Sequence, residues 1–241
     1  SYDEKGRLLS YRGRTRWFDV SYEEEPWWAD EEPSDVVSGS SEMWNTYRML
    51  ADNWLEAYKR FSEGEASRED WEAGYFDHGG IDGAGGCLSY GVSYEPGFAL
   101  EDLNQDGQAE LIMLDSSWII DIFCWHSDGS WYNITPGGRA MYLYANGVVE
   151  SEWGHGNHDY IYYRYSGGTQ MEEITSYYTA WNESYTEREL HDESGRVVPE
   201  DELSDYLDSL GEREFIKYPA TQENLDHLQR GRTDLLSGGF V

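Results

Sequence analysis

Oxygen-bearing side chains recur at every second position over residues 102–106 and then give way to an apolar run. The glycine that follows the third of them suits a sharp turn. Hard oxygen donors at this spacing are the ligands that Ca²⁺ takes in protein loops, whereas Zn²⁺ and copper favour nitrogen and sulfur. We therefore predict a calcium loop that leads directly into a β-strand over 109–114. The predicted ligands are Asp102, Asn104, Asp106, Gln108 through its backbone carbonyl, and Glu110.

The position of the last carboxylate distinguishes this loop from an EF-hand. An EF-hand needs a bidentate carboxylate at position 12, but Met113 occupies that position and Glu110 stands at position 9. The pattern D-x-N-x-D-G-x-x-E-L-I resembles the calcium loops of FG-GAP and VCBS repeats. With its flanking residues, FALEDLNQDGQAELIMLD, it most resembles a group of uncharacterised secreted proteins and lipoproteins of Gram-positive gut bacteria.

The resemblance covers roughly Trp44 to Leu228, although only the loop is a specific motif. It implies Ca²⁺ as the bound ion, an amphipathic helix before the loop that ends like EAYKRFSEGE, and a meander of Tyr-rich strands after it. The alternative interpretation of the loop is an acidic turn that binds no metal.

The charge of the chain limits its partners. The 241 residues carry a formal charge of −31 at pH 7, with a pI near 4.2. Nucleic acids and anionic membranes are bound through clusters of Lys and Arg, so we expect neither as a partner. No apolar run approaches the ~18 residues of a membrane span, so we expect no membrane insertion. Aromatic residues make up 16% of the chain, which predicts a folded globule and not a disordered chain.

The calcium loop also bears on where the protein works. Calcium sites of extracellular modules have Kd values on the order of 10⁻⁴–10⁻³ M, which a resting cytosol would not fill. We therefore expect an extracellular or cell-surface location. The chain begins at Ser1 without a signal peptide or lipid anchor, and we interpret it as a processed or trimmed chain.

Composition divides the chain into three segments. Residues 1–40 are predicted to form a hairpin and an acidic linker, residues 41–231 a single α+β calcium-binding domain, and residues 232–241 a tail. In the linker, Trp27 and Trp28 interrupt a run of carboxylates and prolines. Such a pair can stack on sugar rings, and the alternative is that both side chains pack against the domain.

An amphipathic helix is predicted from Ser41, its expected N-cap, to the residues before Gly64. Its apolar stripe must pack on another element, and the nearest long apolar runs are 111–114 and 118–123. The stripe consists of Met43, Tyr47, Leu50, Trp54, Tyr58 and Phe61.

The remainder of the chain reads as strands followed by short helices. Strands are expected at 118–126 and 131–134, and Asn146-Gly147 is the strongest hairpin signal. Gly167-Gly168 is expected to join strands at 159–165 and 170–179. A helix is predicted from Pro199 to Gly211, and a last short helix with Thr221 as its N-cap is predicted to run to Gln229. The predicted fold class is therefore α+β, with an N-terminal helix packed on an antiparallel β-meander and small C-terminal helices.

Two classes of function remain open. The leading hypothesis is a non-catalytic extracellular calcium-binding module that binds a surface glycan or protein through an aromatic-rich face. The alternative is a secreted, glycosidase-like hydrolase with paired carboxylates, for which we find no catalytic motif. A deep cleft with two facing carboxylates would favour the enzyme. Cys87 and Cys124 are the only cysteines, and a disulfide and two buried thiols are equally consistent with them.

Overall fold

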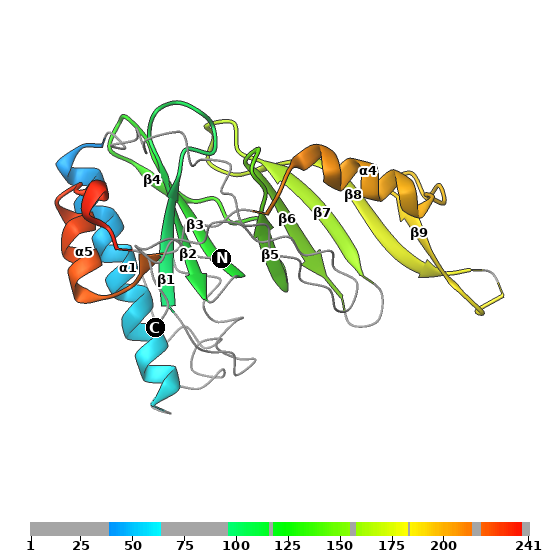
Figure 1. Ribbon diagram of the computed structural model, residues 1–241, viewed down its shortest axis with the longest axis horizontal. Coiled ribbons are helices and arrows are strands. Elements are labelled where there is room, and N and C mark those ends of the chain that lie inside the picture. The colour runs from blue at the N-terminus through cyan, green and yellow to red at the C-terminus, as the bar shows by residue number, and fades with distance from the viewer. Residues whose placement is uncertain are drawn as a thin grey trace, which may run out of the picture.

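The computed structural model describes residues 39–63, 96–115, 118–154, 158–182, 184–213 and 218–237. These residues form two five-stranded antiparallel sheets and three α-helices (Figure 1). The mixed α+β class is confirmed, and most of the regular structure is β. The hairpin and linker of the first segment, with Trp27 and Trp28, lie outside the described residues, as does Cys87.

The first sheet has the strand order β10-β1-β2-β3-β4. Its strands are β1 (Pro96–Glu101), β2 (Glu110–Asp115), β3 (Trp118–Trp125), β4 (Trp131–Asn133) and β10 (Tyr218–Pro219). Every residue of β2 and seven of the eight in β3 are buried, because these strands are central and both of their faces are covered. Helices α1 (Ser41–Ser62) and α5 (Gln222–Gln229) lie side by side on the same flank of this sheet (Figure 1).

Helix α1 packs its predicted stripe against this sheet. Met43, Tyr47, Leu50 and Trp54 are buried in one cluster with side chains of β1, β2 and β3, including Leu111 and Phe123. The predicted partner of the stripe is therefore confirmed. The helix begins one residue earlier than expected: Ser41 is its first residue and Ser40 is the cap, since the Ser40 Oγ accepts a hydrogen bond from the Met43 N–H at 3.1 Å. None of the described helices is long and apolar enough to cross a membrane.

The second sheet has the order β5-β6-β7-β8-β9. Its strands are β5 (Ala140–Leu143), β6 (Val148–Trp153), β7 (Asp159–Arg164), β8 (Glu172–Trp181) and β9 (Arg188–Asp192). The expected hairpin at Asn146-Gly147 joins β5 to β6, and Gly147 takes the positive φ of 78° that this turn requires. A single meander was expected, whereas the strands divide into two sheets: residues 134–138 between β4 and β5 form no strand, and β5 lies beside β3 instead of continuing the first sheet.

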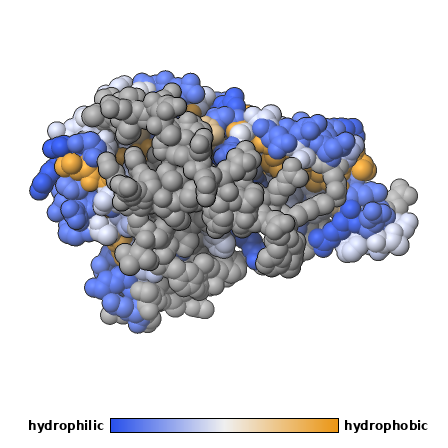
Figure 2. All heavy atoms as spheres, viewed as in Figure 1, coloured by the Kyte–Doolittle hydropathy of each residue, from blue (hydrophilic) through white to orange (hydrophobic). Residues whose placement is uncertain are grey.

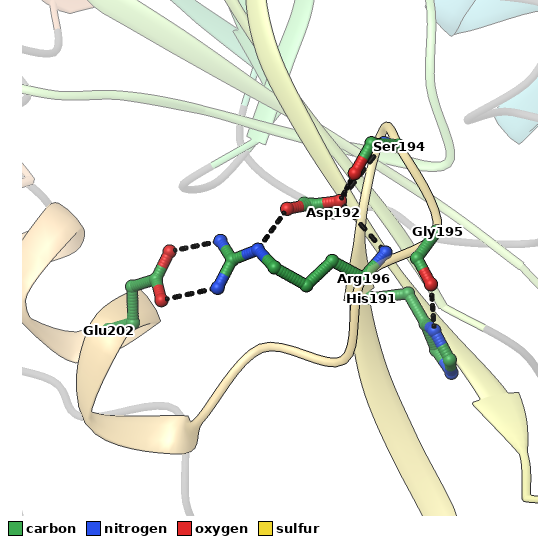
Figure 3. A network of polar contacts seen from close by, with 6 residues as sticks. All are labelled: His191, Asp192, Ser194, Gly195, Arg196 and Glu202. Carbon is green, nitrogen blue, oxygen red and sulfur yellow. Dashed lines mark hydrogen bonds and ion pairs between the residues drawn. The ribbon is translucent and has the colours of Figure 1, made fainter.

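Helix α4 (Glu200–Leu210) covers one face of the second sheet. Figure 2 shows hydrophilic side chains on its outer surface, with apolar ones gathered between the helix and the strands. The Arg196 guanidinium fixes the start of the helix, since it binds both carboxylate oxygens of Glu202, at 2.6 and 3.0 Å, and Asp192 Oδ2 at 2.8 Å (Figure 3). The Arg196 and Glu202 side chains are largely exposed, so the contact orients the helix more than it stabilises the fold.

The two sheets meet where β3 lies beside β5. One buried cluster joins them and includes Ile122 of β3, Ile134 just after β4, and Met141 and Val149 of the second sheet. The chain beyond α5 is also packed: Thr233–Leu235 form a 3₁₀ turn, and Ser237 is bonded through its backbone to the Asn224 side chain. Residues 233–237, assigned to the tail from the sequence, thus belong to the packed structure.

Candidate functional site

The predicted calcium loop is the connection between β1 and β2. Asp102 accepts hydrogen bonds from two backbone N–H groups, that of Asp106 at 3.0 Å and that of Gly107 at 2.8 Å. Asn104 Oδ1 accepts from the Asp106 N–H at 3.1 Å, and Asp106 Oδ1 accepts from the Gln108 N–H at 2.8 Å. Asp102, Asn104, Asp106 and Gln108 therefore lie on one compact turn. Each carboxylate keeps lone pairs that these bonds do not use, because an ionised carboxylate offers about four acceptor positions.

Two residues of the loop adopt positive φ. Gly107 has a φ of 88°, which the glycine provides without strain, and Gln105 has a φ of 60°. The two positive φ values turn the chain back on itself within the segment that carries Asp102, Asn104 and Asp106. Only the positive φ of Gln105, which carries a Cβ, costs free energy, and the hydrogen bonds of the turn offset this cost.

Glu110, the last predicted ligand, lies beneath the loop in the interior. Only 2% of this residue is exposed, and its Oε2 accepts a hydrogen bond from the Leu103 N–H at 2.7 Å. Burial raises the pKa of Glu110 to about 8, and the charges of Asp106 and Asp102 act in the same direction. A nearby positive charge would stabilise the ionised form of Glu110.

No three His, Cys, Asp or Glu side chains converge to form a metal-binding group in the described parts of the chain. The carboxylates of Asp102, Asp106 and Glu110 thus do not form a closed cage by themselves. Any cation in this loop would also use the neutral oxygens of Asn104 and the Gln108 carbonyl. The donor set is all oxygen, which suits Ca²⁺ in kind.

Three elements lie against the loop, and two of them could not be predicted from the sequence. From α1, the Tyr47 hydroxyl donates to the carbonyl oxygen of Ala109 at 2.8 Å. The two hairpin turns of the second sheet approach from the other side: a Cβ on Gly147 would lie 3.2 Å from the Leu103 carbonyl, and one on Gly167 would lie 3.4 Å from Asn104 Nδ2. The loop is therefore the place where the helix and both sheets meet.

A thiol and an imidazole lie close to this junction. Cys124 is a free, buried cysteine, and its Sγ is 3.6 Å from His126 Nε2. The Tyr165 hydroxyl lies 3.3 Å from the same nitrogen and donates to the Gly168 carbonyl at 3.0 Å. Burial raises the pKa of Cys124, so the sulfur stays protonated and is a poor nucleophile. We interpret these side chains as packing that holds the β7–β8 turn.

Two other buried carboxylates, Glu150 and Asp121, have structural roles. Glu150 accepts from the Tyr144 hydroxyl at 2.5 Å and pairs with Arg213 at 2.9 Å. Asp121 Oδ1 accepts from Asn133 Nδ2 at 3.0 Å. A glycosidase dyad needs two carboxyl groups facing each other across a cleft. Glu150 and Asp121 instead lie in different sheets, each with partners of its own.

A second candidate site lies on the second sheet. A pocket of about 560 Å³ lies at the edge of the sheet face opposite α4, where the two sheets meet. The same face carries Trp153, which is 46% exposed. The sequence did not indicate this pocket, because its walls come from segments about 30 residues apart.

Comparison of the chain with models of known protein families, with curated proteins and with solved structures found no match.

Proposed function

We propose that this protein is a non-catalytic extracellular module that binds Ca²⁺ in the loop between β1 and β2. The observation that carries the proposal is the set of oxygen ligands on one compact turn above a buried carboxylate. Asp102, Asn104 and Asp106 would hold the ion together with the Gln108 carbonyl, and Glu110 would supply further negative charge. The ion would offset the repulsion among these carboxylates and thereby stabilise the fold.

Thermal unfolding in EDTA and in millimolar Ca²⁺ tests this proposal. At a hundredfold excess over Kd, a bound ligand adds about 2.7 kcal/mol to the free energy of unfolding, so the Tm should rise by several degrees. Asp106→Asn should abolish the rise. Asp128→Asn is the matched control, because Asp128 accepts a similar N–H bond in the exposed β3–β4 turn, from Ser130 at 2.9 Å. Identical unfolding curves in EDTA and Ca²⁺ would contradict the proposal.

The second part of the proposal is that the module binds a surface glycan or protein. The second sheet supports it, because its face opposite α4 combines an exposed Trp153 with an open pocket. Aromatic side chains with one exposed face are frequent anchors in recognition surfaces. The alternative, a hydrolase with paired carboxylates, has no observation in its favour among the described residues.

A further inference from the structure

The pocket on the second sheet has a defined place in the fold. One wall is the chain that leaves β4, with Asn133, Thr135 and Pro136, and the other is the β7–β8 hairpin, with Tyr163, Gln170 and Glu173. Its volume of about 560 Å³ is within the range of ~300–1,000 Å³ that small-molecule sites occupy. A single sugar ring with part of a neighbour would fit it.

The polar groups on the first wall are held by a buried carboxylate. Asp121 is fully buried and accepts from Asn133 Nδ2 at 3.0 Å. The Thr135 N–H in turn donates to Asn133 Oδ1 at 3.0 Å, and Thr135 Oγ1 accepts from the Ile122 N–H at 2.8 Å. These bonds fix the amide and the hydroxyl before any ligand arrives, which lowers the entropic cost of binding.

The opposite wall supplies an aromatic ring and two carboxylates. Tyr163 is half-buried, and the exposed Glu172 and Glu173 lie at the rim. No Lys, Arg or His is among the residues that line the pocket. An anionic ligand would therefore meet uncompensated negative charge, whereas carboxylates accept hydrogen bonds readily from hydroxyl groups.

The aromatic surface continues beyond the pocket. Tyr160 and Tyr162 pack toward α4, so Tyr163 points to the opposite face. Trp153 pairs with Asp159 in the β6–β7 ladder and shares the face of Tyr163. Its ring also lies 3.6 Å from the position of a Cβ on Gly137, the residue next to Pro136. The exposed ring thus stands close to the pocket.

We propose that this pocket binds one sugar unit of a neutral glycan, with Trp153 available to a neighbouring unit. The sugar ring stacks on Tyr163, and its hydroxyl groups bond to the Gln170 amide and to the rim carboxylates of Glu172 and Glu173. The inference rests on the binding half of the proposed function and names its ligand class. None of the residues that line the pocket is a predicted calcium ligand.

Saturation-transfer NMR on the whole chain tests the proposal, with the neutral disaccharides cellobiose, maltose and lactose as probes and glucuronic acid as the anionic comparison. We expect transfer to at least one disaccharide and none to glucuronic acid. Tyr163→Ala should weaken binding by roughly tenfold, the effect of losing a contact worth about 1.4 kcal/mol. Glu173→Gln should weaken it less, because an amide oxygen still accepts hydrogen bonds.

Matched variants separate binding from folding. Tyr160→Ala removes an aromatic ring from the opposite face of the same strand, so it should leave disaccharide binding unchanged. Equal losses in Tyr163→Ala and Tyr160→Ala would overturn the proposal. An absence of transfer to every disaccharide would also overturn it and would leave a protein as the partner of this face. A Ca²⁺-induced rise in Tm that persists in that case would show that the calcium proposal stands while the sugar site fails.

Discussion

Glu110 makes the stability of the ion-free protein depend on pH. Its pKa is about 8 in the folded state and near the ordinary value of 4.5 in the unfolded chain. Below pH 4.5 the carboxyl group is protonated in both states, so it does not lower the free energy of unfolding. As the pH rises toward 8 the unfolded state releases the proton first, so the free energy of unfolding falls. Each unit of pKa difference corresponds to about 1.4 kcal/mol.

Urea unfolding in EDTA at pH 5, 7 and 9 measures this effect. Glu110→Gln should remove much of the decline between pH 5 and 9, because its amide oxygen still accepts from the Leu103 N–H while carrying no charge. Glu189→Gln, a half-buried carboxylate of β9, is the control and should keep the slope of the parent protein. Parallel pH profiles for Glu110→Gln and the parent would show that Glu110 does not titrate in this range.

At the scale of single elements, Trp54 tests how α1 is held on the first sheet. The indole is 2% exposed within the shared cluster, and its Nε1 has no hydrogen-bond partner among the residues that the structure describes. Trp54→Ala should lower the free energy of unfolding by about 3–5 kcal/mol through the cavity it leaves. Trp54→Phe should cost far less, because no hydrogen bond is lost and most of the ring volume remains. Met49→Ala, on the exposed side of the same helix, should have little effect by urea unfolding.

The elements also show what a sequence can and cannot indicate. The stripe of α1, the Asn146-Gly147 turn and the Thr221 cap, whose hydroxyl accepts from the Asn224 N–H, depend on neighbours within a few residues, and each was predicted. The division of the strands into two sheets was not. It depends on the packing of β3 beside β5, and a local pattern carries no information about such a contact.

The candidate sites differ in the same way. The predicted loop ligands follow a spacing of two residues that is visible in the sequence, whereas the burial of Glu110 and its raised pKa are not. The pocket joins Asn133 to Tyr163 and Gln170, which come together only because β7 and β8 fold back toward the end of β4. The pocket could therefore not be predicted from the sequence.

At the scale of the whole molecule, the charge of −31 predicts which ligands are repelled. Heparin and DNA are polyanions, and long-range repulsion should keep them from the surface at physiological salt. We expect the protein to pass through a heparin column in 150 mM salt, a condition in which surface charges still act over about 8 Å. A basic protein of similar size is the positive control for the column. Salt-dependent retention would reveal a cationic patch that the overall charge conceals.

The position of the loop predicts that Ca²⁺ acts on the whole fold. The loop contacts α1 through Tyr47 and Ala109, and it contacts the second sheet through Gly147 and Gly167. An ion that makes the loop rigid should therefore also restrict these neighbours. Hydrogen exchange should slow on adding Ca²⁺ in β2, in α1 and at both hairpin turns, since local opening of any of them would disturb the bound loop.

Tyr47→Phe isolates one of these connections. It removes the hydrogen bond to the buried Ala109 carbonyl and should cost about 1–3 kcal/mol, while Tyr185→Phe, at a tyrosine that is 78% exposed, should cost nothing measurable. In Tyr47→Phe the Ca²⁺-dependent protection of α1 should decrease, and that of the two hairpin turns should persist, because their contacts with Leu103 and Asn104 are unchanged. Protection confined to β2 in the parent protein would mean that the loop is an isolated turn and that the sheets hold their positions without it.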